Sequence, residues 1–469
     1  MQKSLAKKKS KVALSNPDNR ITSRAGLHLV SKLDDLIGIS KTINESGPSI
    51  KERNRGLSLG SLMLSIAEMM LAGGDFLCDL DFQRDDVAGL PLRAVPDVPA
   101  STTVIGLGKR FDSKVIEGLE RANKKLVSQA FSLLKDSRKK DLVSKRPTID
   151  LDPTDVEVYG SKKEGVAYNY QGQLCYRPHL VVWAEAGLVL TGELGSGKDS
   201  PCPQAPSLIK KAVEALPSGL LRPIIRCDSG FFSKSVAKAA IENNADFAIA
   251  AKRNSALWHS MRQIPGESWR EATDMFAEVA ECDYVPSLWP KGTRTIVRRV
   301  KYNSNELEKD SRSRRRRTVD PSQLTLLEDG EIPFAYAYSF IVTNLDGDIL
   351  DIEHWFRKRA LVEERIKDSK LGLALRHLPS GYEAVNSMWM FGAFLALNIS
   401  AWLQVITGQD GGNGGRAHGK RLRRELILIA ARITKHAKQI QVHASKSDSD
   451  GSFGEAWRAL DILLTSRGP

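Results

Sequence analysis

The sequence predicts an α/β fold: a mixed β-sheet with helices on its faces, interrupted by a β-rich insertion. Three observations indicate it. Between residues 146 and 253, short apolar runs of strand length alternate with longer runs at helical spacing. Residues 254–335 break this rhythm with short strand-like runs, which predict an insertion subdomain. Residues 336–408 then resume the alternation and complete the core.

The N-terminal part predicts helices. Residues 1–24 are basic and polar, which is typical of a flexible arm. Residues 25–145 predict a helical domain, with one helix over Leu57–Ala72 that ends at two glycines and another over Val115–Leu134. Such a domain could hold a helix-turn-helix that binds DNA ends, although no sharp signature for one is present.

The first part of the core begins with a loosely alternating strand over Thr148–Tyr159. An antiparallel pair is expected next, Leu174–Glu185 with Leu188–Leu194, around the turn Ala186-Gly187. The remaining expected elements alternate between helix and strand: helix Ser207–Leu216, strand Pro223–Cys227, helix Ser233–Asn243 and strand Phe247–Ala251.

The second part follows the insertion. The expected elements are a strand over Ala337–Thr343 and helices over Ile352–Lys370 and Val385–Ile406. The apolar run Met388–Leu403 is shorter than the roughly 20 residues of a membrane span, so we expect a buried core helix there and no membrane association. Residues 409–469 predict a glycine-rich hinge and a basic helical C-terminal region, with a helix over Lys420–Gln441.

Composition points to a polyanionic partner. The net charge is +13, which favours nucleic acid, although a merely basic cytosolic enzyme is the alternative. The five cysteines are scattered without a C-x-x-C pair, and no apolar segment of a secretory signal follows the N-terminal lysines. A reducing cytoplasm is therefore the expected compartment.

Three carboxylates are candidates for chemistry. Asp150 and Asp152 occupy alternate positions of a predicted strand and so share a face. Asp228 ends an apolar strand beside a glycine turn, a place typical both of metal ligands and of plain turn residues. Glu363 lies on the predicted helix Ile352–Lys370, beside its apolar stripe.

That helix carries an aromatic and several bases on the face of the acid. Their spacing places them within an arc of roughly 80°; they are Phe356, Arg359, Glu363, Lys367 and Lys370. A solvated charged face is the simpler explanation, but it does not account for the aromatic residue. Three carboxylates would suit phosphodiester cleavage, because two Mg²⁺ ions about 3.5–4 Å apart stabilise the attacking, transferring and leaving oxygens.

With these motifs in place, the chain resembles the DDE transposases of bacterial insertion sequences, in the branch with a β-rich insertion between the second Asp and the Glu. Asp150-Leu151-Asp152-Pro153-Thr154 is similar to the family's first-Asp strand, which favours Asp152 over Asp150. The segment 227–231 is similar to its second-Asp motif. The family signature Tyr-x-x-Arg-x-x-x-Glu-x₆-Lys is matched at Arg359, Glu363 and Lys370, with Phe356 in place of Tyr.

The resemblance implies a ribonuclease-H-like core with Asp152, Asp228 and Glu363 as catalytic residues and metal ligands, and Asp150 as a further candidate ligand. It implies two Mg²⁺ ions, for which Mn²⁺ can substitute. It also implies a homodimer on double-stranded DNA that pairs terminal inverted repeats for cut-and-paste transfer to target DNA, in the bacterial cytoplasm at the nucleoid. The alternatives are an inactive transposase-derived DNA-binding protein and a metal nuclease without strand transfer.

DNA contacts are expected from two groups of residues. Arg359 and Lys370 are assigned to phosphates beside the scissile bond, with Lys367 and Phe356 on the same face. The run from Arg312 to Arg317 lies in the insertion and is expected to grip the DNA backbone without reading bases; the residues predicted to do so are Arg314, Arg315, Arg316 and Arg317.

Overall fold

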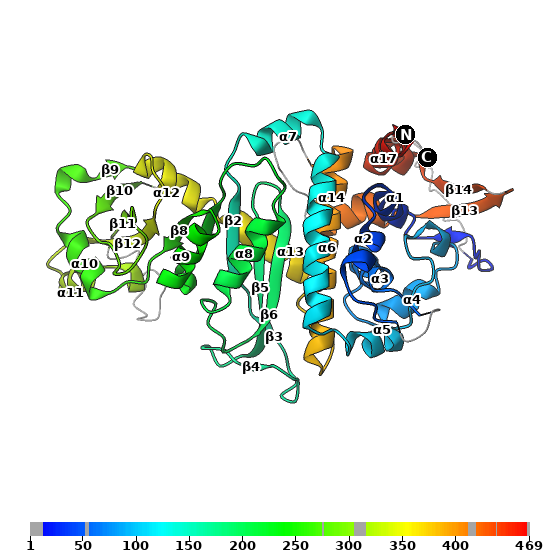
Figure 1. The fold of residues 1–469 in the computed structure, drawn as a ribbon, viewed down its shortest axis with the longest axis horizontal. Coiled ribbons are helices and arrows are strands. Elements are labelled where there is room, and N and C mark those ends of the chain that lie inside the picture. Colours follow the sequence, from blue (N-terminus) through cyan, green and yellow to red (C-terminus); the bar gives the residue numbers. More distant parts are fainter. Residues whose placement is uncertain are drawn as a thin grey trace, which may run out of the picture.

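A computed structural model describes residues 13–51, 56–273, 276–303, 316–410, 419–437 and 439–466. The molecule is elongated, with the insertion at one end, the core sheet in the middle and the helical N-terminal domain at the other end (Figure 1). One continuous hydrophobic core runs from the N-terminal helices into the sheet.

Seven α-helices form the N-terminal domain, over the part of residues 25–145 that the structure describes. They are α1 (Leu27–Ile37), α2 (Ile39–Ser46), α3 (Leu59–Leu71), α4 (Asp79–Arg84), α5 (Ser101–Gly108), α6 (Ser113–Ser132) and α7 (Asp136–Val143). The two helices predicted here are confirmed as α3 and α6. Gly73 follows α3 with a φ of 96°, a backbone conformation that favours glycine, and so ends the helix.

The core sheet is mixed, as predicted. Its strands are β2 (Thr148–Pro153), β3 (Val156–Glu157), β4 (Ala167–Tyr168), β5 (Leu174–Trp183), β6 (Leu188–Ser196), β7 (Ile224–Cys227) and β8 (Asp246–Ala250). β5 pairs antiparallel with both β2 and β6, whereas β7 is parallel to β2 and β8 is parallel to β7. The ribonuclease-H-like mixed sheet with flanking helices, expected from the sequence, is therefore confirmed.

Two helices join the sheet to the N-terminal domain, α8 (Ala205–Ala215) and α14 (Glu383–Thr407), while α9 (Lys234–Glu242) packs on α8 and β8. α14 packs along α3 and against β6. By length and composition it could cross a membrane, but 94% of its apolar window is buried inside the protein. Its buried Asn398 accepts a hydrogen bond from the Val189 N–H of β6 at 2.8 Å and donates to the Val189 carbonyl at 2.9 Å. The expected buried core helix is thus confirmed.

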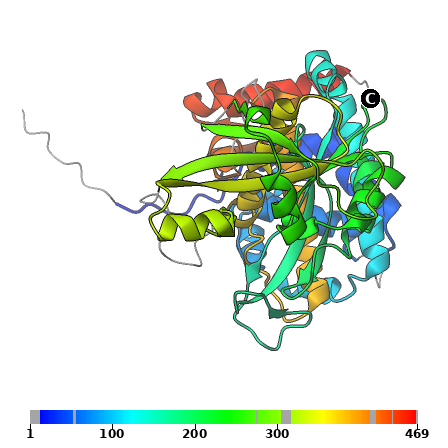
Figure 2. The same cartoon turned by 90° about the vertical axis from the view of Figure 1, so that its left-hand side faces the viewer.

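The insertion extends the core sheet rather than standing apart from it. It contains β9 (Arg270–Glu271), β10 (Ala277–Cys282), β11 (Arg294–Asn303), β12 (Phe334–Thr343), α10 (Ser255–Arg262) and α11 (Pro321–Glu328). Only the last three residues of β12, Ile341–Thr343, pair with β8, while β11 pairs with β12 over the whole of its length. The insertion's sheet thereby projects from the core as a long twisted ribbon (Figure 2).

The C-terminal region differs from the prediction of a helix over Lys420–Gln441. After α15 (Gly419–Leu422) and a π-helical turn, the chain forms β13 (Ala431–His436) and β14 (Gln439–Ala444). These segments alternate apolar and polar residues and contain β-branched side chains, which suits a strand. β1 (Ile21–Thr22), at the end of the predicted flexible arm, pairs with β13. α16 (Lys446–Asp450) and α17 (Ser452–Ser466) follow, and α17 packs on α1 and α14.

Candidate active site

Two of the predicted carboxylates stand side by side at the end of the core sheet. Asp152 is the penultimate residue of β2, Asp228 directly follows β7, and the two strands are parallel neighbours. Leu151 pairs with Cys227, so the next residue of each strand reaches the same edge. The Asp228 Oδ1 accepts a hydrogen bond from the Gly230 N–H at 2.8 Å, which orients this carboxylate at the start of a short 3₁₀ helix.

The pKa of Asp152 is affected by the third candidate carboxylate, Glu363. The pKa of Asp152 is raised to about 7, chiefly by burial, and the positive charge of Arg359 opposes that rise. Negative charges contribute to the same rise, and they come from Asp228, Glu363 and Asp150. The Arg359 Nη2 donates to the Asp152 Oδ1 at 2.9 Å, and both side chains are 15% exposed. In the structure, Asp228 and Glu363 thus lie close enough to Asp152 for their charges to affect its pKa. Arg359 forms an ion pair with Asp152.

The donor set suits a hard divalent cation. Its members are carboxylates, the ligands that Mg²⁺ prefers, and their mutual repulsion favours a bound cation. Glu363 is exposed on α13 (Ala360–Gly372) and is the outer member of the group. Within the described ranges, no three His, Cys, Asp or Glu side chains lie close enough together to hold an ion. The cation in contact with Asp152 is the Arg359 guanidinium.

The helix predicted over Ile352–Lys370 is two helices, α12 (Ile349–Arg357) and α13, with Arg359 at the junction. The break between the two helices follows from the hydrogen bonds of the Trp355 carbonyl. A continuous α-helix would need the Arg359 N–H to donate to the Trp355 carbonyl. That carbonyl instead accepts from the Arg226 guanidinium at 2.8 Å and from the Lys358 N–H at 3.1 Å. The Arg359 N–H bonds the Phe356 carbonyl at 3.3 Å, so the turn tightens and the helix ends.

The break separates residues that were expected to share one helix face. Phe356 is on α12, where its half-buried ring packs beside Trp355 in a small hydrophobic cluster. Lys367 is exposed on α13. Lys370 is half-buried, and its Nζ donates to the backbone carbonyl of Asp155 at 2.6 Å. Lys370 therefore ties α13 to the chain just beyond β2.

Asp150, a further candidate metal ligand in the sequence, forms an ion pair with an arginine in the structure. It faces Arg226 in the register of β2 and β7. Its two carboxylate oxygens accept from the Arg226 Nε at 2.6 Å and Nη2 at 2.8 Å. The side chain of Asp150 is 0% exposed and that of Arg226 2%. Both oxygens of the Asp150 carboxylate are therefore engaged by Arg226 inside the sheet.

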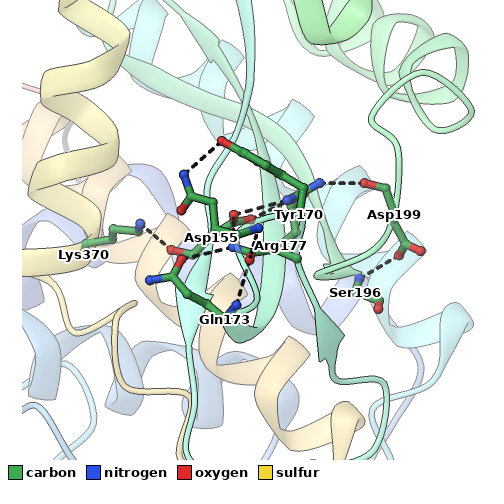
Figure 3. A network of polar contacts seen from close by, with 9 residues as sticks. Asp155, Tyr170, Gln173, Arg177, Ser196, Asp199 and Lys370 are labelled. Carbon is green, nitrogen blue, oxygen red and sulfur yellow. Dashed lines mark hydrogen bonds and ion pairs between the residues drawn. The ribbon is translucent and has the colours of Figure 1, made fainter. Parts of the chain in front are cut away.

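A polar network that the sequence analysis missed surrounds Asp155 (Figure 3). The Asp155 carboxylate accepts from the Arg177 Nε at 2.7 Å and Nη2 at 3.2 Å, and from the Asn169 amide at 2.9 Å. Arg177 also donates to the Asp199 carbonyl at 2.9 Å. The network joins the segment between β2 and β3 to β5 and, through Lys370, to α13. The available signal was the position of Asp155, three residues after Asp152 at the same strand end.

Two open basic grooves lie on elements that carry the candidate carboxylates, one next to Asp228 in the chain and one along α13. The insertion groove adjoins Ser229, the neighbour of Asp228, and its charged lining residues are Lys252, Arg253, Arg316 and Arg317. Arg316 forms an ion pair with Glu328, and Arg317 is exposed. Arg314 and Arg315, which were predicted to contact DNA, lie outside the described residues.

The second groove, here called the helix groove, runs beside α13. Its basic lining residues are Lys367, Lys420, Arg421 and Arg424. Arg421 and Arg424 both form exposed ion pairs with Glu425. Pairs of this kind contribute little to stability and can exchange for another anion at small cost.

Comparison with known proteins identifies a family. A family model described as "Transposase DDE domain group 1" matches residues 4–453. Among solved structures, the chain is similar to piggyBac transposase in a synaptic complex with hairpin DNA, at a TM-score of 0.42 and 10% sequence identity, over 96% of this chain and 82% of that chain. No curated protein sequence gives a significant match.

Proposed function

The chain belongs to the transposase DDE domain group 1 family, and from this premise we propose that it cuts DNA at the ends of a bacterial insertion sequence and joins those ends to target DNA. The reaction we propose is metal-dependent phosphodiester hydrolysis followed by strand transfer. The observation that carries the proposal is the placement of Asp152 and Asp228 at adjacent strand ends, with Glu363 close enough to raise the pKa of Asp152.

Asp152, Asp228 and Glu363 are the proposed ligands of two Mg²⁺ ions, which Mn²⁺ could replace. When bound, such ions activate the attacking oxygen and stabilise charge on the phosphoryl and leaving oxygens. The protein's own groups prepare the site. The Gly230 N–H holds the Asp228 carboxylate in place, and the Arg359 guanidinium offsets the charge of Asp152. With cations bound, Arg359 could instead donate two hydrogen bonds to two oxygens of one phosphate group.

The two basic grooves are the proposed paths of double-stranded DNA near the carboxylates. Their lysines and arginines would contact phosphates and fix the position of the duplex without reading its sequence. Pairing two terminal inverted repeats requires two copies of the chain, so a homodimer on DNA is part of the proposal, as is action at the bacterial nucleoid.

The test uses Asp228→Asn, in the full chain, on labelled DNA that carries the terminal repeats flanking its gene. Asparagine keeps an oxygen that accepts from the Gly230 N–H but removes the charge. We expect cleavage in Mg²⁺ to be abolished and binding of the DNA ends to be retained, as measured on gels of products and of complexes.

Asp283→Asn is the matched control, because Asp283 is exposed in the insertion and should leave both properties unchanged. Loss of cleavage and binding together in a well-folded Asp228→Asn protein would give Asp228 a structural role. Cleavage without joined strands in the wild type would indicate a nuclease, and binding without cleavage an inactive DNA-binding protein.

A further inference from the structure

Exposed tyrosines gather in one segment next to the candidate active site. Residues 157–173, here called the tyrosine loop, connect β3 to β5 by way of β4. Tyr159, Tyr168 and Tyr170 are 93%, 65% and 87% exposed. Among the other tyrosines, all of which the structure describes, Tyr382 is the most exposed at 43%. Three large aromatic rings in solvent within one loop are not the scattered apolar residues of an ordinary surface.

The loop is held firmly although its tyrosines are exposed. The Lys163 ammonium donates to the carbonyls of Leu378 at 2.8 Å and Ser380 at 3.0 Å, and the Glu164 N–H donates to the Gly381 carbonyl at 2.9 Å. At the turn, the Asn169 side chain donates to the Asp155 carboxylate at 2.9 Å, within the network drawn in Figure 3. A fixed backbone that presents exposed rings loses little conformational entropy when it binds a ligand.

The sheet fixes how far the tyrosine loop lies from the carboxylates. Asp152 pairs with Leu180 of β5, and Glu157 pairs with Cys175 further along the same strand. Five residues of extended chain span about 17 Å. That length equals about five nucleotide steps of about 3.4 Å each. A DNA strand whose phosphate lies at Asp152 and which runs along this edge would reach the loop within about five nucleotides.

The chemistry of the tyrosine loop suits bases better than phosphates. Its two lysines, Lys162 and Lys163, balance its two glutamates, Glu157 and Glu164, so it carries no net charge. Apart from the tyrosines, its exposed residues are small, polar or charged. Every nucleobase has a π-face, and stacking on an aromatic side chain needs no sequence match.

We propose that the tyrosine loop stacks unpaired bases of the DNA flanking the cleaved phosphodiester. The inference rests on the proposed function, because it takes DNA cleavage at the three carboxylates as given. Unpaired bases are required, since the faces of bases inside a duplex are already stacked on their neighbours. The loop would thus hold the strand open beside the site, while the grooves hold the duplex.

The experiment compares two fluorescent DNAs, a fork with unpaired arms and a fully paired duplex of the same length. Affinities are measured by anisotropy over a range of salt concentrations in EDTA, so that no cleavage occurs. The test protein combines Tyr159→Ala, Tyr168→Ala and Tyr170→Ala. A second variant protein combines the Phe substitutions at the same three positions, which keep the aromatic rings. Phe82→Ala removes another exposed ring, 64% exposed on α4, and is the matched control.

We expect the Ala protein to lose about tenfold or more in affinity for the fork and less than about twofold for the duplex. Its salt slope, the slope of the logarithm of DNA affinity against the logarithm of salt concentration, should be unchanged, because no phosphate contact is removed. The Phe protein and Phe82→Ala should bind like the wild type. Melting temperatures, which the exposed side chains should not affect, show whether each variant is folded.

Other results overturn the inference. Equal losses on both DNAs, or a flatter salt slope, would mean that the loop contacts the backbone. No loss for the Ala protein, with fewer two-copy complexes in sedimentation, would make the loop a protein–protein surface. If the wild type binds neither DNA, the proposed function itself is wrong, and the inference fails with it.

Discussion

At the scale of single residues, Asp150 and Asp152 lie on one face of β2 but differ in role: Asp150 forms a structural ion pair, and Asp152 is a candidate catalytic residue. Asp150 is neutralised by a two-bond ion pair with Arg226. Asp152 has a single bond to Arg359, and burial still raises its pKa to about 7. The sequence placed both on one face, but it could not tell which was paired, because the partner of Asp150 comes from β7, 76 residues later in the chain.

We predict that Asp152→Asn stabilises the metal-free protein. The pKa of Asp152 is about 7 in the fold against an ordinary value of 3.8, so the folded state holds this proton more tightly than the unfolded chain. The resulting stabilisation is present below about pH 4 and is lost as pH rises through 7. At about 1.4 kcal/mol per pKa unit, Asp152→Asn should raise the free energy of unfolding at pH 8 by at most about 4 kcal/mol. Urea titrations between pH 4 and 8 measure it.

The matched control on the same strand face is Asp150→Asn, which should lower the free energy of unfolding rather than raise it. It leaves the buried Arg226 without its counter-charge and should destabilise the protein by about 3–5 kcal/mol. Millimolar Mg²⁺ should raise the melting temperature of the wild type but not that of Asp152→Asn. Equal destabilisation by both substitutions would show that Asp152 is only another structural ion-pair partner.

At the scale of elements, the sequence predicted most of the core and failed where tertiary contacts override local pattern. From β2 to β8, most strands and helices were found to within a few residues, because their apolar runs and turn glycines are local signals. The strand predicted over Thr148–Tyr159 is two strands, β2 and β3, and β4 was not predicted. The break between α12 and α13 has no proline or glycine to mark it; it depends on the Arg226 guanidinium, which takes the Trp355 carbonyl. β13 was mistaken for a helix, and its strand partners include β1, far away in sequence.

The break makes the position of α13 depend on side-chain tethers, and Lys370 is one of them. We predict that Lys370→Met, which keeps the length of the side chain but removes its bond to the Asp155 carbonyl, lets α13 shift relative to β2. Because Glu363 lies on α13, cleavage should slow by roughly tenfold to a hundredfold, with DNA affinity nearly unchanged. Hydrogen exchange of the α13 amides should increase without DNA, a result that a phosphate contact would not produce.

Lys367→Met is the matched substitution on the same helix, since Lys367 is exposed in the helix groove. It should weaken binding and lower the salt slope by about one, while hydrogen exchange stays unchanged. If Lys370→Met instead lowers affinity and salt slope as Lys367→Met does, Lys370 contacts a phosphate, as the sequence had suggested.

At the scale of the whole molecule, the net charge of +13 is a guide to partners but not to the place where they bind. The sequence marked one arginine run in the insertion. The structure adds Lys252 and Arg253, which follow β8 and meet the end of that run in one groove beside Ser229. The two parts of the groove meet beside β12, because β12 pairs with β8 at Ile341–Thr343 and Val319, two residues after Arg317, bridges to Ala337 of β12. Sequence spacing alone does not reveal such a convergence.

The last prediction tests whether the insertion groove is the path of the DNA. Lys252 and Arg317 are exposed there, next to the residue that follows Asp228. If each contacts one phosphate, Lys252→Ala with Arg317→Ala should weaken duplex binding and lower the log–log salt slope by about two. The matched pair, Lys435→Ala with Lys446→Ala, removes the same charge from exposed sites in β13 and α16; β13 is at the opposite end of the molecule from the insertion (Figure 1). Equal effects of the two pairs would mean that net charge alone attracts DNA, whereas a lower slope for the groove pair only would place phosphates beside Asp228.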